Sequence, residues 1–308
     1  MADPTLLVRL HSLGDIVLAS GAAAALAQRG PVLFAVNPAY VPVVDRIPGQ
    51  VTPVPVTETG ELRRAAGGCA RVIDLQNSIK TRFALMCIPA KKYSFSRRKR
   101  RRILRGSGER MEWRAREFMK VAGVEEGNPA PVLRRKGEPA AAPMRVGIVT
   151  GGRWPMKSIP PGVAAELARL YCDCSGASVF LLGSSGDRNE ALAVRDACGY
   201  RNVEAVAGEG DVSTLIERIE GLHLLVSPDS GPAHLGIALG VPTMVVFTST
   251  SPALGFFSSG RRGSFMVPDI PCRPCHRHGG TRCRTGDGNC RKMLVPGEIY
   301  RESLCLMQ

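Results

Sequence analysis

The chain has 308 residues, enough for two domains that each bury a hydrophobic core. A hydrophobic content of 44% with 22% charged residues is typical of a folded globular protein and excludes a disordered chain. The formal net charge is +14, and it is uneven: residues 1–145 carry 25 Lys and Arg against 12 Asp and Glu, residues 146–308 carry 16 against 15. We therefore expect the first half to meet an anionic partner, whether nucleic acid, an acidic membrane surface or a phosphorylated substrate.

Targeting signals are not apparent in the sequence. No apolar run approaches the ~20 residues of a membrane-spanning helix, and the N-terminal residues lack the pattern of a secretory signal. The ten cysteines do not form the dense framework of a small secreted domain. We expect a cytoplasmic protein in which most cysteines are buried thiols.

In the first half, short apolar segments alternate with helical patterns. Strands are predicted at Leu6–Leu10, Val32–Val36 and Arg71–Leu75, and helices at Ile16–Gln28 and Glu109–Val121. Strands made of consecutive apolar residues are typical of a parallel sheet covered by helices on both faces. A segment rich in Pro, Ala and Gly at residues 127–144 predicts a linker. We therefore expect one domain at residues 1–143 and a second at residues 144–308.

The same alternation returns in the second half. Strands are predicted at Arg145–Thr150, Val179–Leu182, His223–Ser227 and Thr243–Phe247, and helices at Val163–Tyr171, Glu190–Ala197, Val212–Ile219 and Ala233–Leu239. This pattern predicts a doubly wound α/β domain. Two such domains are expected to face a ligand cleft with the carboxyl ends of their strands.

The strongest candidate binding feature lies at residues 224–242, where a predicted strand leads through a turn into a helix at Gly231-Pro232-Ala233-His234. Pro at the first helical positions is typical of a helix start. The free N–H groups and the dipole of such a helix favour a phosphate, and glycine lets it approach the backbone. The same pattern also fits a capped helix that binds nothing, with His234 as a packing residue.

Six short segments carry recognisable patterns: RLHSLGD at 9–15, DLQNS at 74–78, GGRWPMK at 151–157, DSGPAHL at 229–235, GVP at 240–242 and TSP at 250–252. Their composition and order resemble the motifs of glycosyltransferase family 9, the ADP-heptose:lipopolysaccharide heptosyltransferases of bacterial outer-membrane synthesis. The resemblance extends over most of the chain.

The resemblance implies the GT-B architecture, an α/β fold with two Rossmann-like domains whose parallel sheets face a central cleft. It also implies inverting transfer of heptose from ADP-heptose to the lipopolysaccharide inner core, without a metal or an organic cofactor. Asp15 matches the family's catalytic base, which takes a proton from the acceptor hydroxyl. The donor site implied by the matching motifs contains Lys157, Asp229, Ser230, Gly231, Pro232, Ala233, His234 and Thr250. Ser184, in the Gly/Ser turn after the predicted strand Val179–Leu182, is also placed to line this pocket.

Nine Lys or Arg residues fall within the fifteen positions from Lys91 to Arg105. In the family, the N-terminal domain receives the anionic inner core, so this run is expected to bind the acceptor and the inner face of the inner membrane. The acceptor-binding candidates are His11, Lys91, Lys92, Arg97, Arg98 and Arg100. A solvated loop or an RNA-binding arm are the alternatives, and nucleic acid is the less favoured partner because no known RNA-binding module accompanies the run. His11 fits a surface or packing role equally well.

Four cysteines near the C-terminus, Cys272, Cys275, Cys283 and Cys290, lie within nineteen residues. Four thiolates are a possible structural zinc site, although a second CxxC pair is absent. A redox-linked pair and unlinked thiols are the alternatives.

Two segments depart from the family pattern. Ser20-Gly21 stands where many relatives have Thr-Pro, and Thr248 stands where they have glycine in the loop expected beside the nucleotide phosphates. The second departure leaves donor identity open. The alternatives are a related transferase with another nucleotide-sugar or anionic acceptor, and a binding protein without transferase activity.

Overall fold

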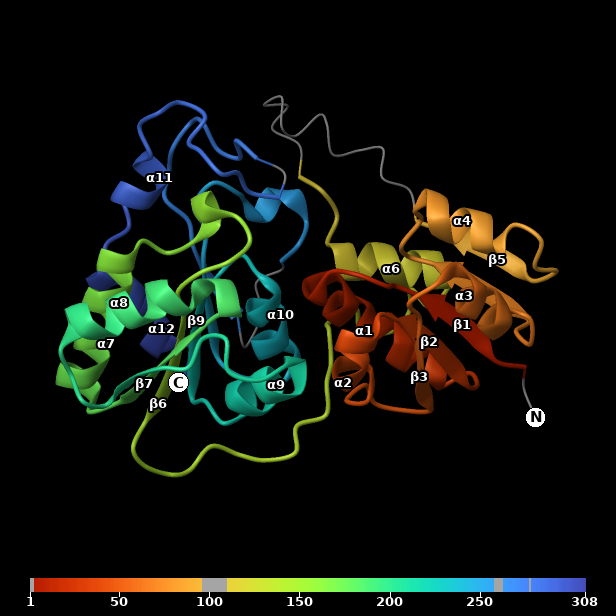
Figure 1. Cartoon of the computed structure of the whole chain (residues 1–308), viewed down its shortest axis with the longest axis horizontal. Coiled ribbons are helices and arrows are strands. Elements are labelled where there is room, and N and C mark those ends of the chain that lie inside the picture. Colours follow the sequence, from red (N-terminus) through yellow and green to blue (C-terminus); the bar gives the residue numbers. More distant parts are fainter. Residues whose placement is uncertain (1–2, 96–109, 258–262, 277) are drawn as a thin grey trace. The chain divides into compact units, whose positions relative to one another are not determined.

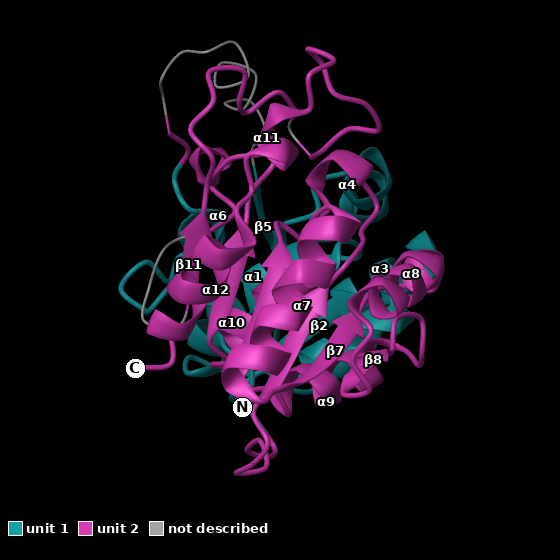
Figure 2. Ribbon diagram, turned by 90° about the vertical axis from the view of Figure 1, so that its left-hand side faces the viewer, with its two compact units in different colours: residues 1–98, 112–135 teal, residues 99–111, 136–308 magenta. Residues whose placement is uncertain are grey.

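The computed structural model describes residues 3–95, 110–257, 263–276 and 278–308. The chain divides into two compact units, shown in different colours in Figure 2. Unit 1 comprises residues 1–98 and 112–135, and unit 2 comprises residues 99–111 and 136–308. The domain boundary expected after residue 143 stays a prediction.

Unit 1 is built on a five-stranded parallel sheet with the order β3-β2-β1-β4-β5 (Figure 1). Its strands are β1 Thr5–Val8, β2 Val32–Val36, β3 Val51–Pro55, β4 Arg71–Asp74 and β5 Lys91–Ser94. Its helices are α1 Leu13–Ala27, η1 Pro38–Tyr40, α2 Val41–Val44, α3 Thr59–Ala66, α4 Ile79–Leu85 and α6 Arg114–Ala122. Alternating strand side chains point to opposite faces, so Leu6 and Val8 share a core with Leu62 of α3 and Ala84 of α4.

Helix α1 lies close to the extended segment that follows α6. The hydroxyl of Ser20 accepts a hydrogen bond from the Val132 N–H at 2.8 Å. A Cβ on Gly21 would lie 2.7 Å from the carbonyl oxygen of Ala130, so only glycine admits this approach. The departure at Ser20-Gly21 therefore has a structural reason: both residues receive the backbone of residues 130–132.

Unit 2 contains a six-stranded parallel sheet with the order β11-β10-β9-β6-β7-β8. Its strands are β6 Arg145–Val149, β7 Ser178–Leu182, β8 Val203–Ala205, β9 Leu224–Pro228, β10 Thr243–Val246 and β11 Gly263–Met266. Its helices are η2 Pro155–Lys157, α7 Pro161–Ser175, η3 Ser185–Asp187, α8 Arg188–Cys198, α9 Val212–Glu220, α10 Gly231–Ala238, η4 Pro252–Leu254, α11 Asn289–Lys292 and α12 Pro296–Cys305. The expected fold class, α/β with two Rossmann-like parallel sheets, is confirmed.

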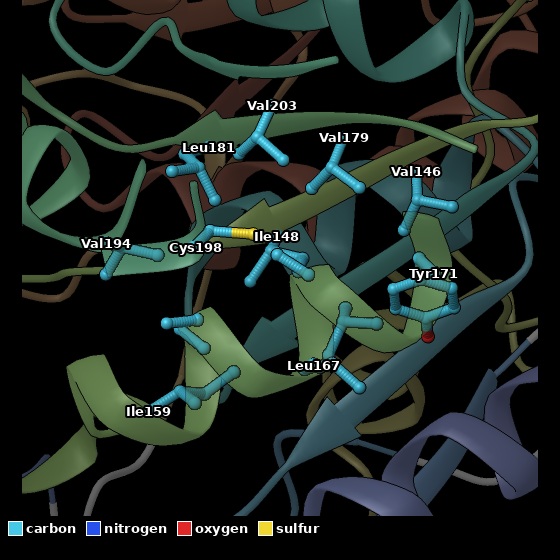
Figure 3. Packing of buried hydrophobic residues seen from close by; sticks show 14 of the residues in the cluster. Val146, Ile148, Ile159, Leu167, Tyr171, Val179, Leu181, Val194, Cys198 and Val203 are labelled. Atoms are coloured by element: carbon cyan, nitrogen blue, oxygen red, sulfur yellow. The ribbon is translucent and has the colours of Figure 1, made fainter. Parts of the chain in front are cut away.

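The core of unit 2 lies between the sheet and α7. Helix α7 starts with Pro161 in its first turn and ends at Gly176, whose φ of 58° is the left-handed conformation that glycine adopts readily. Leu167 and Tyr171 of this helix pack against Ile148 and neighbouring strand residues (Figure 3). The terminal helix α12 closes the cluster through residues such as Ile299.

The predicted interior strands are all present, with ends that shift by one or two residues. Helix α6 begins at Arg114, so the predicted start at Glu109 is wrong for the described residues 110–113, which are not helical. The expectation that most cysteines are buried is also wrong: all ten are free thiols, and the buried ones are Cys69, Cys172, Cys198 and Cys290. Among the described residues, no helix has both the length and the apolar content to span a membrane.

Replacing Tyr171 by Phe is expected to lower the free energy of unfolding by about 1 kcal/mol, the value of one buried hydrogen bond. The Tyr171 hydroxyl lies 2.5 Å from the Ser303 hydroxyl of α12, which in turn donates to the carbonyl of Tyr300 at 2.7 Å. Burial raises the pKa of Tyr171, so this hydroxyl stays protonated and donates. Denaturant-induced unfolding measures the change.

Tyr200→Phe is the matched control, because the Tyr200 hydroxyl bonds Asp173 at the exposed surface. Its loss is expected to change stability by less than about 0.5 kcal/mol. Equal effects at both positions would show that α12 is not held through Tyr171.

Candidate functional site

In unit 2, the strand order reverses between the adjacent strands β6 and β9. From β6 the chain continues through β7 to β8 at one edge of the sheet, and from β9 it continues through β10 to β11 at the other edge. In open parallel sheets, ligands bind beyond the carboxyl ends of the strands at such a reversal. The segments that follow β6, β7, β9 and β10, which include η2 and the start of α10, carry all nine residues of the predicted donor site. The reversal therefore gathers residues that lie far apart in the sequence.

An ion pair joins the loops that follow β6 and β9. The Lys157 ammonium lies 2.9 Å from Oδ2 of Asp229, and the side chains are only 18% and 8% exposed. The Thr250 hydroxyl, from the loop after β10, donates to the same oxygen at 2.7 Å. One buried carboxylate thus fixes a cation and a hydroxyl from two other loops.

Helix α10 begins beside this pair in the chain, directly after Asp229. Ser230 is its N-cap residue, and its hydroxyl pairs with that of Ser227 at 3.0 Å instead of capping the helix. Gly231 and Pro232 form the first turn, so the N–H groups there add a partial positive charge to that of Lys157.

His234 is buried in α10 and stacks on Phe257, with ring centroids 4.0 Å apart and planes at 9°. Ala233 belongs to the same apolar cluster as Phe257 and Phe247. These two predicted donor residues therefore support α10 by packing. The packing alternative considered for His234 is the one that the geometry favours.

The predicted residue Ser184 lies in the exposed loop after β7. Its N–H and hydroxyl both donate to Oδ2 of Asp187, at 2.8 and 2.6 Å. The other oxygen of Asp187 accepts from the Gly152 N–H at 3.0 Å. A Cβ on Gly151 would lie within 2.0 Å of that oxygen, so glycine is required for the loops to approach.

The departure at Thr248 is also explained by a contact within the loops. Its hydroxyl donates to the carbonyl of Met156 at 2.7 Å, and the side chain is buried. Thr248 thereby ties the loop after β10 to η2, which carries Lys157. The hydroxyl of Thr248 therefore has a hydrogen-bond partner within the chain.

In unit 1, the strand order reverses between β1 and β4, and Asp15 lies in the first turn of α1 just after β1. Its carboxylate forms an ion pair with Arg9 through Oδ2, while its Oδ1 has no hydrogen-bond partner among the described residues. Arg9 is buried and also donates to the carbonyl of Leu75, beyond the end of β4, at 2.9 Å. Ser12, with a φ of 78°, makes the turn that leads into α1.

Asp74, at the end of β4, is a buried carboxylate at the same edge. Burial raises its pKa, although the N–H groups of Asn77 and Gln76 and the Thr81 hydroxyl favour the ionised form. These bonds shape the turn into α4. The DLQNS motif therefore has a clear structural role.

The predicted acceptor residues are dispersed. His11 is exposed in the loop between β1 and α1. Lys91 and Lys92 are exposed on the edge strand β5, and Lys92 donates to the carbonyl of Met86 at 2.9 Å. Arg97, Arg98 and Arg100 lie outside the described residues.

The four C-terminal cysteines of the predicted zinc site differ in environment. Burial raises the pKa of Cys275 and Cys290, whereas hydrogen bonds from the Thr285 hydroxyl and the Gly288 N–H lower the pKa of Cys283. Within the described part of the chain, no group of three or more candidate ligands has a geometry that could hold a metal ion. The structural zinc site at these cysteines therefore stays a prediction.

Residues 60–280 match the family model described as glycosyltransferase family 9 (heptosyltransferase). The chain belongs to glycosyltransferase family 9. It is 32% identical over 126 residues to lipopolysaccharide heptosyltransferase 1 of Pseudomonas aeruginosa, a match that covers 41% of this chain and 34% of the length of that relative. The aligned part thus spans about a third of the curated relative.

Two solved structures share the fold over nearly the whole chain. The E. coli ADP-heptose lipopolysaccharide heptosyltransferase II has a TM-score of 0.74 at 17% identity, covering 99% of this chain and 98% of its own. The E. coli heptosyltransferase WaaC with ADP has a TM-score of 0.74 at 16% identity, covering 98% and 99%. These likenesses show that this family 9 chain has the fold of the GT-B heptosyltransferases.

Sequence reasoning missed Arg9, Asp187 and Phe257, whose roles are to position other residues. Arg9 lies within the motif at residues 9–15, but the sequence pattern did not indicate that it pairs with Asp15. A carboxylate following Ser184 by three residues is the spacing of a capping box, which is a readable signal for Asp187. Phe257 carried no signal, because its stacking on His234 arises from tertiary packing.

Gly151→Ala is expected to lower the free energy of unfolding of unit 2 by about 1–3 kcal/mol. The new Cβ would meet Asp187, which three hydrogen bonds hold in place. Gly162→Ala is the control, because it adds the same methyl group in α7 where no atom lies within 4 Å. Thermal unfolding compares the two, and equal melting temperatures would contradict the close approach of the two loops.

Proposed function

We propose that this family 9 chain is an inverting glycosyltransferase that moves heptose from ADP-heptose to a hydroxyl of the lipopolysaccharide inner core. The observation that carries the proposal is the Lys157 ammonium, which Asp229 holds in place close in the chain to the start of α10, where free N–H groups favour a phosphate. The WaaC structure, which shares the fold, contains ADP. No organic cofactor enters the proposed reaction.

The donor would be held by its diphosphate. The backbone N–H groups of Gly231 and Ala233 and the Lys157 ammonium are the donors for the phosphate oxygens. Thr250 and Ser184 line the same strand ends. An ammonium held at one place stabilises the charge that develops on departing ADP, since the cation needs no reorganisation during the reaction. Asp229 sets its position.

In the transfer step, the acceptor oxygen attacks C1 of heptose from the face opposite the diphosphate. The bond between C1 and the phosphate oxygen breaks, its electron pair leaves with ADP, and the anomeric configuration inverts. Asp15 takes the proton of the attacking hydroxyl. Oδ1 is the oxygen that we assign to this proton, because Oδ2 is already paired with Arg9.

The proposed acceptor and location follow from the excess of positive charge in residues 1–145. The candidate residues His11, Lys91, Lys92, Arg97, Arg98 and Arg100 would bind the carboxylates and phosphates of the inner core. We propose that the protein works in the cytoplasm at the inner face of the inner membrane, where anionic lipid attracts the same basic run. Nucleic acid is not a proposed partner.

Asp15→Asn is expected to lower kcat at least about 100-fold, because the amide cannot accept the proton. ADP affinity is expected to stay unchanged, since Asp15 is not part of the proposed donor site. Turnover is measured by ADP release together with the mass gain of a Kdo–lipid A acceptor. Asp45→Asn, an exposed carboxylate of unit 1, serves as the control; near-normal turnover of the Asp15 variant would remove the base assignment.

Lys157→Met is expected to weaken ADP binding about tenfold or more, the value of a charge-assisted bond to phosphate. Titration calorimetry with ADP measures this, and thermal unfolding checks that the loss of a partner for Asp229 leaves unit 2 folded. Lys292→Met removes an exposed lysine of α11 and should leave the affinity unchanged. Unaltered ADP affinity in the Lys157 variant would place the diphosphate elsewhere.

Transfer assays with wild-type protein separate the proposal from its alternatives. Acceptor-dependent ADP release with a heptose mass gain supports heptosyl transfer. Binding of ADP-heptose without transfer to any inner-core acceptor would favour another acceptor or a binding protein, and failure to bind it would favour another nucleotide-sugar.

A further inference from the structure

Helix α4 of unit 1 presents three large apolar side chains to solvent. Ile79 is 87% exposed, and Phe83 and Met86 are each 64% exposed. Their spacing of four and three residues places them on one face of the helix. The opposite face of the helix is buried, since Ala84 and Leu85 pack in the core of unit 1. We call Ile79, Phe83 and Met86 the α4 apolar face.

Single exposed apolar residues are common, but a set of three on one helix face marks a contact surface. The sequence that contains this face is uniformly basic: residues 75–108 include eleven Lys and Arg and neither Asp nor Glu. Of the described members, Lys80, Arg82, Lys91 and Lys92 are all exposed. The bond from Lys92 to the Met86 carbonyl brings β5 beside the end of α4 (Figure 1).

We propose that the α4 apolar face inserts into the surface of an anionic lipid bilayer, with the surrounding lysines and arginines held against the lipid headgroups. Interfacial helices bind in this way, and their affinity grows with both buried apolar area and anionic charge. A stable protein interface buries roughly 1,200–2,000 Å² in total, far more than three side chains supply. A second copy of this chain would bring the same positive charge to the contact and be repelled.

The placement of α4 fits this role, and this step rests on the proposed function. Helix α4 begins after β4, at the carboxyl edge of the sheet, and Ile79 belongs to its first turn. Asp15 lies at the same edge after β1, and Arg9 bridges to the carbonyl of Leu75 beyond β4. A lipid-anchored glycan can therefore present a sugar hydroxyl to this edge while its acyl chains stay in the bilayer that α4 enters.

The first test measures binding to vesicles of phosphatidylethanolamine and phosphatidylglycerol by co-sedimentation. The triple variant Ile79→Ser, Phe83→Ser, Met86→Ser is expected to lower the partition coefficient about tenfold or more. The control replaces Met293, Val295 and Met307 of unit 2 by Ser, removing side chains that are 51%, 48% and 40% exposed. Equal binding by the triple variant and wild type overturns the inference.

Two further variants test depth and charge. Phe83→Trp should show a blue shift in tryptophan emission with anionic vesicles and none with phosphatidylcholine, after subtraction of the two native tryptophans. Lys80→Gln with Arg82→Gln should weaken binding about fivefold for each charge removed, and added salt should weaken the wild type. An unshifted Trp emission on bound vesicles would show that α4 stays outside the bilayer.

Activity assays distinguish failure of this inference from failure of the proposed function. With a short inner-core sugar that lacks lipid, the triple variant should retain wild-type turnover, whereas with vesicle-borne acceptor it should lose about tenfold. Vesicle binding that depends on the α4 apolar face supports the inference even if no heptose is transferred. Dimerisation of the wild type, abolished in the triple variant, would instead assign the face to a second copy and overturn the bilayer proposal.

Discussion

The reversal of strand order at the centre of each sheet is the constraint on which both candidate sites depend. Connections leave the two central strands toward opposite faces of the sheet, so the carboxyl ends of β1 and β4, and of β6 and β9, stay open to loops. In each unit, a basic side chain connects the loops that follow the two central strands. Arg9 reaches from β1 to the carbonyl of Leu75 in unit 1, and Lys157 reaches from the loop after β6 to Asp229 in unit 2. A buried cation needs a partner within bonding distance. The Arg9–Leu75 and Lys157–Asp229 contacts therefore fix the position of one loop against the other in each unit.

The loops of unit 2 also receive support from the cysteine-rich segment. Gly279 packs so closely that a Cβ there would lie 2.6 Å from the Lys157 side chain, and its φ of 99° excludes most other residues. The Gly280 carbonyl accepts from the Met156 N–H at 3.0 Å, and the Cys275 N–H donates to the carbonyl of Ser249 at 3.2 Å. This segment therefore acts on the site through its backbone. Through these contacts the segment supports the loop that carries Lys157.

The sequence allowed the interior of each sheet to be predicted but not its edges. The four strands missed, β3, β5, β8 and β11, are the edge strands of the two described sheets. Interior strands are covered on both faces and carry consecutive apolar residues, as Leu6 to Val8 do. Edge strands are partly solvated, so β3 contains two prolines and β5 two lysines, which hide the strand pattern.

The candidate site shows the same division. Asp15, Lys157 and the start of α10 follow from motifs, because each lies in a segment with a local pattern. The partners that orient them are distant in sequence: Lys157 and Asp229 are brought together by a sheet, and Thr248 reaches Met156 from 92 positions away. Such pairs form only in the tertiary structure. The sequence gives the identities of the two residues but does not indicate that they are in contact.

The two units use positive charge over different ranges. The lysines of β5 are exposed, so their attraction for anions is long-ranged but weakened by salt, with a Debye length of about 8 Å at physiological ionic strength. Lys157 is mostly buried and paired, so it acts on groups in direct contact and is screened much less. Exposed charge attracts any anion, lipid or nucleotide alike, and cannot select among them. In the proposed function, selection of the nucleotide-sugar therefore falls to unit 2, while the exposed lysines of unit 1 add attraction to an anionic surface.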